Sequence, residues 1–196
     1  MIKIGITGTI GSGKSIISNI LEILEIPVYN ADVNAKRIML NDNIVKDKLI
    51  EYFGDIVYDG NSLNKKFLSE RIFSLDSDRK FVNSVVHPMV IKDFQRWSDN
   101  QNFNIIAIES ALLYEAQVDK IIDYVVEVKS PVELLIKRLI LRDNISVEEA
   151  KNRINIQMMS QNFEKKANFV IINDEKSSVL EQILNIHKII KTKCRQ

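Results

Sequence analysis

An eight-residue segment near the N-terminus, GTIGSGKS at residues 8–15, constrains this chain more than any other part of its sequence. The segment matches the pattern G-x-x-x-x-G-K-[ST] at every position. A β-branched, apolar run at residues 2–7 predicts a strand before it, and apolar residues at helical spacing over residues 16–24 predict a helix after it. This order predicts a phosphate-binding loop, because glycines let successive backbone N–H groups point at one anion and the helix N-terminus adds partial positive charge.

Two side chains of the loop are candidates for direct contact with a nucleotide. Lys14 is expected to reach the β- and γ-phosphates, and the Ser15 hydroxyl is expected to coordinate Mg²⁺. The loop therefore predicts a nucleoside triphosphate and Mg²⁺ as the bound species. The other candidate nucleotide contacts belong to the loop or directly follow it: Gly8, Gly11, Ser12, Gly13 and Ile16.

The composition of the chain excludes several other classes of protein. Of its 196 residues, 45% are hydrophobic and 27% charged, as in a single globular domain with a substantial core. The formal net charge of +1 creates no field that would recruit nucleic acid or an anionic membrane, so neither is expected as a partner. The single cysteine, Cys194, allows neither an intramolecular disulfide nor a cysteine metal site.

The sequence also carries no sign of export or membrane insertion. No apolar run approaches the roughly 18 residues that a transmembrane helix needs. The N-terminus leads directly into the predicted strand and phosphate loop, not into a secretory signal. A cytoplasmic protein is therefore expected, and the sequence makes no prediction about its oligomeric state.

The order of predicted elements indicates the fold class. Further strands are expected at residues 26–29, 104–109, 122–128 and 169–172, and helices separate most of them. Such alternation predicts an α/β fold of the P-loop NTPase type, with a parallel sheet of about five strands and helices on both faces. We expect a single kinase domain over residues 1–196, with three parts. They are a core at about 1–30, 104–130 and 167–196, a helical insertion on the acceptor side at about 31–103, and a short helical lid at about 131–166.

The sequence predicts that the expected insertion contains helices and no strands. Helices are predicted near residues 44–53 and 67–73, with a turn at 59–61 between them. A helix over residues 78–86 is expected to stop at Pro88, and another follows over residues 89–99. His87 would then lie at a corner between helices, where a histidine more often binds a backbone carbonyl than a substrate.

Acidic residues follow two of the predicted strands. Asp32 comes just after the second strand, where side chains of an open α/β sheet face the ligand crevice. It could also be the N-cap of a helix over residues 33–40, and the two roles are compatible. Glu109 ends the third strand, a position where many phosphate-loop proteins carry an acid linked to the metal, and Glu115 is its rival. Both could equally be capping or surface carboxylates.

Two short helices rich in basic residues follow the fourth strand. Capping-box patterns at residues 130–133 and 146–149 predict where they begin, and Pro131 is expected at the first position of the first helix. A third capping box at residues 178–181 opens the last helix. The basic residues of the pair include Arg138 and Arg142. They fit a lid that closes over phosphates, or equally a solvated basic face paired with glutamates.

These residues favour a small-molecule kinase. Phosphoryl transfer requires in-line geometry and charge neutralisation, which Lys14, the loop amides and lid arginines could supply. Asp32 is placed to accept the proton of an acceptor hydroxyl. The only Asn-Lys pair, at residues 64–65, lacks the aspartate of a guanine-reading motif. Two alternatives remain: a kinase of the same architecture that acts on a nucleoside monophosphate or a sugar, and a regulator that binds ATP without transferring phosphate.

Beyond these patterns, nearly the whole chain resembles the dephospho-coenzyme A kinase family. Arg138, Arg142 and Gln157 fit the family's R-x-x-x-R…Q. The other matching segments, in chain order, are GITGTIGSGKS (5–15), N-A-D (30–32, family D-A-D), LSERIF (68–73), VHP (86–88), ALLYE (111–115, family P-L-L-[FV]-E) and ANFVIIN (167–173, family A-D-x-[VI]-I-x-N). The loop alone is generic, whereas the ordered set is specific.

The resemblance implies transfer of the ATP γ-phosphoryl group to the ribose 3′-hydroxyl of dephospho-coenzyme A, the last step of coenzyme A synthesis. It implies Asp32 as the general base. It places Arg138 and Arg142 on the lid, with Arg138 as a candidate catalytic residue and Arg142 as a candidate nucleotide contact. It also implies that Asn173 lies near the adenine.

The same resemblance implies acceptor-side residues: Arg71, His87 and Glu115 become candidates for binding dephospho-coenzyme A. The chain departs from the family pattern in a few places. Thr9 replaces a glycine and Ile16 a threonine, while Asn30 replaces the first aspartate of D-A-D. Ala111 replaces a proline and Asn168 an aspartate. None of these changes removes Lys14 or Asp32.

Overall fold

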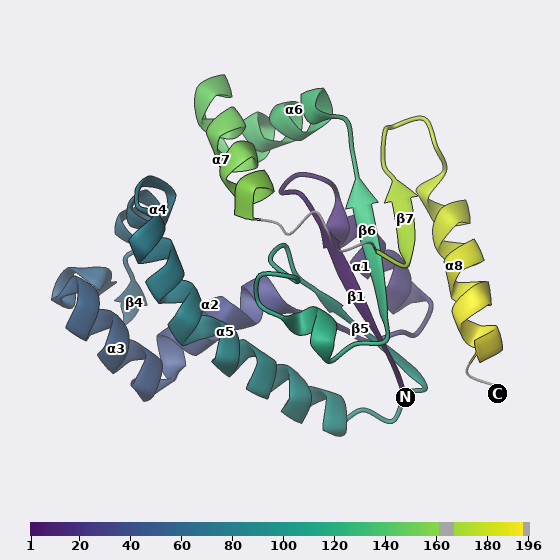
Figure 1. Ribbon diagram of the computed structural model, residues 1–196, viewed down its shortest axis with the longest axis horizontal. Helices are drawn as coiled ribbons and strands as arrows, with labels where there is room; N and C mark the ends of the chain where they lie inside the picture. The colour runs from purple at the N-terminus through teal and green to yellow at the C-terminus, as the bar shows by residue number, and fades with distance from the viewer. Residues whose placement is uncertain (161–166, 194–196) are drawn as a thin grey trace. The chain divides into compact units, whose positions relative to one another are not determined.

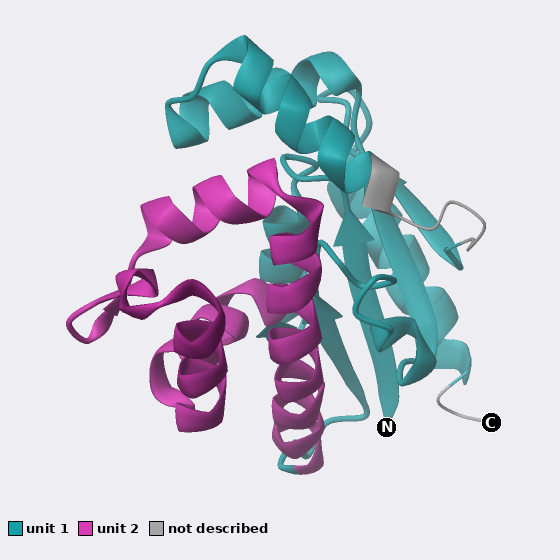
Figure 2. Cartoon of the chain, turned by 60° about the vertical axis from the view of Figure 1, so that its left-hand side comes forward, with its two compact units in different colours: residues 1–30, 100–196 teal, residues 31–99 magenta. Residues whose placement is uncertain are grey.

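The computed structural model describes residues 1–160 and 167–193, so Cys194 and part of the expected lid segment lie outside the described residues. The chain forms two compact units (Figure 2). Unit 1 comprises residues 1–30 and 100–196, and unit 2 comprises residues 31–99. In the described part of the chain, no helix is both long and apolar enough to cross a membrane.

Unit 1 is built on a parallel sheet of five strands with the order β2-β5-β1-β6-β7 (Figure 1). The strands are β1 (Ile2–Gly8), β2 (Val28–Asn30), β5 (Ile105–Glu109), β6 (Tyr124–Lys129) and β7 (Phe169–Ile172). All five residues of β5 are buried, which explains its continuous apolar sequence. The predicted α/β class and the number of strands in the parallel sheet are therefore confirmed.

Helices α1 (Lys14–Ile23) and α8 (Val179–Lys193) pack against one face of this sheet. Their buried residues, Ile17 and Leu21 of α1 and Ile183 and Ile190 of α8, share one apolar core with β1 and β6. Burying each such side chain contributes about 1.5–3 kcal/mol. On the other face, Gly5 of β1 lies directly under the segment between β5 and β6, which includes the 3₁₀ turn η2 (Val118–Lys120).

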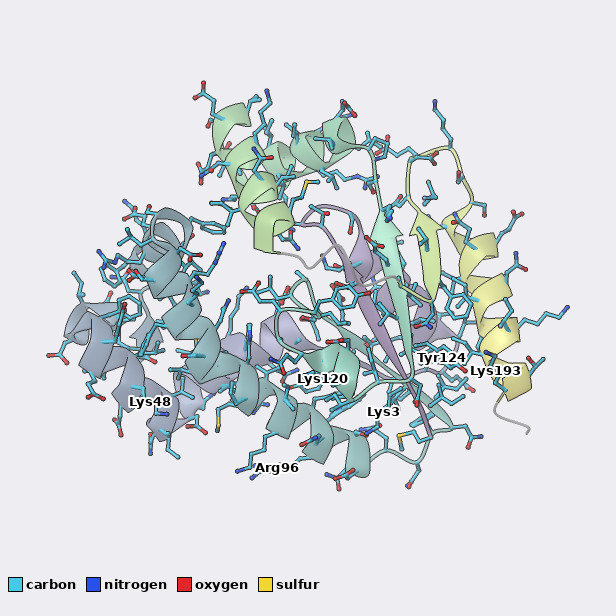
Figure 3. All side chains as sticks on the ribbon, viewed as in Figure 1. Lys3, Lys48, Arg96, Lys120, Tyr124 and Lys193 are labelled. Carbon is cyan, nitrogen blue, oxygen red and sulfur yellow. The ribbon has the colours of Figure 1, made fainter. Side chains whose placement is uncertain are left out.

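Helix α8 also contacts the strands at both ends of the sheet. The Nζ atom of Lys193 lies 5.1 Å from the centre of the Tyr124 ring, a cation–π contact at the start of β6 (Figure 3). The edge strand β7 is covered at its last residue by Gln182. The Gln182 amide accepts a hydrogen bond from the Ile172 N–H and donates one to the Ile172 carbonyl, both at 2.9 Å.

Helices α6 (Val132–Asp143) and α7 (Val147–Ser160) follow β6 and form a pair beyond its carboxyl end (Figure 1). Their buried residues form a small apolar core of their own: Leu135, Leu139, Ala150 and Ile154. The predicted caps at Ser146 and Ser178 are confirmed, since each hydroxyl accepts a hydrogen bond from the N–H three residues later. The capping box predicted at Ser130 is wrong. Pro131 is the N-cap of α6, and no side chain caps that helix.

Unit 2 is mostly helical. Its elements are α2 (Ala31–Asn41), α3 (Asn43–Phe53), η1 (Asp55–Val57), β3 (Tyr58–Asp59), β4 (Ser62–Leu63), α4 (Lys65–Ser74) and α5 (Asp76–Asp99). Strands β3 and β4 form a small antiparallel hairpin. The prediction of a block without strands is therefore wrong at residues 58–63, although the turn expected at 59–61 is present. Two-residue strands are too short to produce a recognisable alternation of apolar and polar residues.

The prediction that Pro88 ends a helix is also wrong, because α5 continues through it from Asp76 to Asp99. A proline removes the hydrogen bond to the carbonyl four residues earlier, here that of Ser84. Both Ser84 and Pro88 are exposed, so water can satisfy that carbonyl. His87 therefore lies inside a continuous helix and not at a corner between helices.

Candidate active site

The predicted phosphate loop lies between the end of β1 and the start of α1, at the carboxyl edge of the sheet. Gly13, the N-cap of α1, has φ +93°, and a Cβ atom there would lie 2.3 Å from Nδ2 of Asn173. Gly8 has φ +148°, and a Cβ there would lie 2.3 Å from the carbonyl oxygen of Val128. Only glycine fits these two positions, so the turn that shapes the loop is a direct consequence of the sequence.

The ammonium group of Lys14 folds back over this loop. Its Nζ donates hydrogen bonds to the carbonyl oxygens of Gly8, at 3.0 Å, and Thr9, at 3.3 Å. The residue is 7% exposed, so its charge is held at the loop and not in bulk water. Ser15 and Ile16 follow in the first turn of α1, and both are exposed. The N-terminus of α1 with its partial positive charge and the Lys14 charge thus meet at one place.

Asn173, expected near an adenine, supports the phosphate loop from the end of β7. Its Nδ2 donates to the Ser12 carbonyl at 2.8 Å, and its backbone N–H donates to the Lys129 carbonyl at 2.8 Å. The Ser130 hydroxyl lies 3.1 Å from the Ser12 carbonyl and 2.7 Å from the Asn173 carbonyl. Ser130 therefore ties the loop to the neighbouring strand ends instead of capping α6.

Of the two arginines expected on a lid, Arg138 reaches the phosphate loop. Its Nη1 donates to the Gly11 carbonyl and to the Ser130 hydroxyl, both at 3.2 Å. Its Nη2 lies 3.5 Å from Oδ1 of Asn173 and 3.2 Å from Oε1 of Glu175. Arg138, Asn173 and the loop thus form one connected group of donors and acceptors.

Arg142 makes its hydrogen bonds one turn further along α6. Its guanidinium donates to both carboxylate oxygens of Asp143, at 2.7 and 3.0 Å. The hydrogen bond from Arg142, together with the charges of Arg142 and Arg153, holds the pKa of Asp143 below its ordinary value. Arg142 is therefore paired with an aspartate.

The ends of β5 and β2 meet α1 through Glu109. The Glu109 carboxylate is 5% exposed, and its Oε2 accepts hydrogen bonds from the Ser18 hydroxyl at 2.7 Å and from Nδ2 of Asn30 at 3.3 Å. Asn30, which stands where the resembled family has an aspartate, therefore supplies a donor beside a buried carboxylate. Glu115, the rival acid, lies half-buried in the segment after β5.

The remaining predicted site residues belong to unit 2. Asp32 is exposed and lies in the first turn of α2, two residues after β2 ends, where a negative charge favours the helix. Because α2 begins at Ala31, Asp32 is not the N-cap. Arg71 of α4 donates from Nε to the buried carboxylate of Asp78 at 2.6 Å. His87 is half-buried in α5.

Two residues that bind the loop are not among the predicted site residues. The local pattern of Ser130 predicts a helix cap and gives no sign of a contact with the loop. Gln157 of α7 matched the resembled pattern without an assigned function, yet it is 8% exposed and binds the phosphate loop. It lies 147 residues from its partner Ile10, so only the three-dimensional structure reveals the contact.

The family model and the sequence relatives name one family. The family model for dephospho-CoA kinase matches residues 2–179. The dephospho-CoA kinase of Bacteroides fragilis is 39% identical over 186 residues, which cover 94% of this chain and 91% of that protein. The enzyme of Porphyromonas gingivalis is 34% identical over 194 residues, covering 98% and 96%.

A solved structure shares the fold over nearly the whole chain. The crystal structure of TT1252 from Thermus thermophilus superposes with a TM-score of 0.80 at 29% identity, covering 98% of this chain and 97% of that one. The family match spans both units and every segment that carries the site described above. The chain belongs to the dephospho-CoA kinase family.

Proposed function

We propose that the loop of residues 8–15 holds the phosphates of ATP and that the γ-phosphoryl group passes from there to the ribose 3′-hydroxyl of dephospho-CoA. The family's reaction is the ATP-dependent phosphorylation of dephospho-CoA, the final step of coenzyme A synthesis. The observation that carries the assignment to this loop is the position of Lys14, whose Nζ is held 3.0 Å from the Gly8 carbonyl. The proposal includes a cytoplasmic location.

The residues at the N-terminus of α1 fit a bound Mg²⁺. Mg²⁺ prefers oxygen ligands and in kinases takes most of them from phosphates and water, with only one or two from protein. The exposed Ser15 hydroxyl is such a ligand. Within residues 1–160 and 167–193, no cluster of three His, Cys, Asp or Glu side chains could form a separate metal cage. When bound, Mg²⁺ would neutralise charge on the β- and γ-phosphate oxygens.

Asp32 is proposed as the general base. Its carboxylate would accept the proton of the 3′-hydroxyl while that oxygen bonds to the γ-phosphorus. The bond from the γ-phosphorus to the bridging oxygen breaks, and ADP leaves with the electron pair. Lys14 and Arg138 would stabilise the charge on the transferring group. Gly8, Gly11, Ser12, Gly13, Ile16, Arg142 and Asn173 complete the proposed nucleotide contacts.

The acceptor is assigned to the helical insertion, and α6 with α7 to the lid. In unit 2, Arg71 is held by Asp78, whose side chain is 3% exposed and also accepts a hydrogen bond from Tyr52 at 3.2 Å. An arginine fixed through Nε is suited to bind an anionic group with its terminal nitrogens. His87 and Glu115 are the other proposed contacts of dephospho-CoA.

The proposal is tested with an acceptor panel. ADP release is measured with ATP, Mg²⁺ and dephospho-CoA, and with adenosine, AMP or gluconate as controls. Release is expected only with dephospho-CoA. Activity on a control compound would identify that compound as the acceptor in place of dephospho-CoA. ATP binding without acceptor-dependent ADP release would favour a nucleotide-binding regulator.

Two variants test the named residues. Asp32→Asn is expected to keep its affinity for ATP and to lose about 10²- to 10⁴-fold in kcat. Asp47→Asn, which changes an exposed carboxylate of the same unit, is the control and should match the wild type. Lys14→Ala is expected to weaken ATP binding and turnover together. Normal turnover of Asp32→Asn would exclude Asp32 as the general base. Normal ATP affinity of Lys14→Ala would mean that ATP does not bind at this loop.

A further inference from the structure

Gln157 joins three segments of unit 1 through a single side-chain amide. Its Oε1 accepts the backbone N–H of Ile10, in the phosphate loop, at 2.7 Å. Its Nε2 donates to the carbonyl of Ala111, just after β5, at 3.0 Å and lies 3.4 Å from the carbonyl of Gly8. The residue is 8% exposed, so water does not easily replace these hydrogen bonds.

The Ile10 side chain is held by the same pair of helices. It packs against the small core formed by Leu135 and Leu139 of α6 with Ala150 and Ile154 of α7. Its backbone N–H is bonded to Gln157 on α7. Both the side chain and the backbone of this loop residue therefore depend on where α6 and α7 lie.

A second link brings Gln157 close to the lysine of the loop. The Gly8 carbonyl that Nε2 of Gln157 approaches is also the acceptor for Nζ of Lys14, at 3.0 Å. One residue after Ile10, the Gly11 carbonyl accepts a hydrogen bond from Arg138 of α6 at 3.2 Å. The helix pair thus contacts the backbone of the phosphate loop at three residues of its first half, Gly8, Ile10 and Gly11.

We propose that Gln157 is a positioning residue for ATP: by joining α7, the segment after β5 and the phosphate loop, it sets the loop conformation that receives the phosphates. This inference rests on the proposed function, because it takes the loop as the ATP site. Without the amide, the half-buried Ile10 N–H and Ala111 carbonyl lose their partner, and the loop relaxes to restore their hydrogen bonds. The loop conformation that binds phosphates is then less populated. The apparent affinity for ATP falls in proportion to the fraction of molecules that still have this conformation.

The test compares two variants of Gln157 with a matched control. Gln157→Leu removes all the hydrogen bonds at similar volume, and Gln157→Glu keeps an acceptor for Ile10 but loses the donor to Ala111. Gln182→Leu is the control, because Gln182 also bridges a backbone N–H and a carbonyl with its amide, at the sheet edge. The Kd for ATP, kcat, and the KM values for ATP and dephospho-CoA are measured for each folded variant.

For Gln157→Leu we expect an increase of about tenfold in Kd and KM for ATP, corresponding to about 1.4 kcal/mol, with less than twofold change in KM for dephospho-CoA. Gln157→Glu should lie between this variant and the wild type. Gln182→Leu should leave all these constants within about twofold. A purely structural role for Gln157 would lower thermal stability without this selective loss of ATP affinity.

Unchanged ATP affinity in both Gln157 variants would overturn the inference. If Lys14→Ala weakens ATP binding in the same series, the proposed function survives; if Lys14→Ala binds ATP normally, the proposed function itself fails. Hydrogen exchange of the Ile10 amide in the wild type without nucleotide is a test that needs no variant. Protection is expected, and exchange at the rate of an open loop amide would contradict the inference.

Discussion

Replacing Gly13 with alanine tests the packing that shapes the phosphate loop. An added Cβ would lie 2.3 Å from Nδ2 of Asn173, closer than any real contact of this kind, at a residue with φ +93°. The Asn173 amide would have to move, and its 2.8 Å hydrogen bond to the Ser12 carbonyl would be lost. Gly11→Ala is the graded comparison. Its φ is +82°, but its added Cβ would come no closer than 3.2 Å, to the Leu135 carbonyl.

The expected losses in free energy of unfolding follow from these contacts. A left-handed backbone with a side chain costs about 1–2 kcal/mol. Loss of a buried hydrogen bond adds about 1–3 kcal/mol. Gly13→Ala should therefore destabilise the protein by about 2–5 kcal/mol, and Gly11→Ala, whose added Cβ makes a tight contact but displaces no hydrogen-bonded side chain, by about 1–2 kcal/mol.

Urea unfolding followed by far-UV circular dichroism measures these differences, with unchanged m-values as the check that the transitions are comparable. A double-mutant cycle identifies the cause. In an Asn173→Ala background, where the obstructing amide is gone, Gly13→Ala should cost only about 1–2 kcal/mol. Equal losses for Gly13→Ala and Gly11→Ala, or an unchanged loss in the Asn173→Ala background, would refute the reasoning.

Three further predictions concern residues around the site and the core. The Ser130 hydroxyl binds the Ser12 and Asn173 carbonyls instead of capping a helix. Ser130→Ala and Ser130→Asp should therefore both lower the free energy of unfolding in urea by about 0.5–1.5 kcal/mol. Wild-type stability of Ser130→Asp would instead support the interpretation of Ser130 as a helix cap. The pKa of Asp143 is lower in the folded protein than its ordinary value of 3.8. The ionised carboxylate therefore contributes fully to the free energy of unfolding above pH 3.8, and this contribution is lost as the pH falls through the pKa of the folded protein. Asp143→Asn should thus be less stable than the wild type by up to about 1 kcal/mol at pH 7, and thermal melts should show the difference shrinking below pH 3.8; a constant difference would contradict this. Burial, and then the charge of Lys191, lowers the pKa of His187 below 6.5 in the folded protein. The unfolded chain therefore binds a proton at His187 first as the pH falls. Acidification from pH 7.5 to 5.5 should destabilise the wild type by at most about 1.4 kcal/mol per pH unit. His187→Gln should reduce that slope, and an identical slope in the variant would argue against His187 as its source.

Local patterns predicted the sheet and the phosphate loop because each is specified by neighbouring residues. The continuous apolar run of β5 indicates a strand buried on both faces, and it lies beside β1. The glycines and lysine of the loop are consecutive in the sequence, so the turn, the helix start and the position of Lys14 can be inferred together.

The same local rules failed where distant contacts compete with them. Ser130 has the pattern of an N-cap, but its hydroxyl binds carbonyls of residues that follow other strands. Pro88 is a helix breaker in isolation, yet the packing of buried residues on both sides of it, such as Val86 and Val90, continues α5 through it. The contact between Gln157 and Ile10 joins residues 147 positions apart, and no local pattern could predict it.

The amide of Gln182 has a consequence for how the protein behaves at high concentration. β7 lies at the edge of the sheet, and its side chains Val170 and Ile172 are 44% and 39% exposed. An apolar edge strand of this kind can pair with a strand of another molecule and start aggregation. Because Gln182 already binds both the N–H and the carbonyl of Ile172, a strand of another molecule cannot form hydrogen bonds to the last residue of β7. The opposite edge, β2, spans only Val28–Asn30 and offers little length for such pairing.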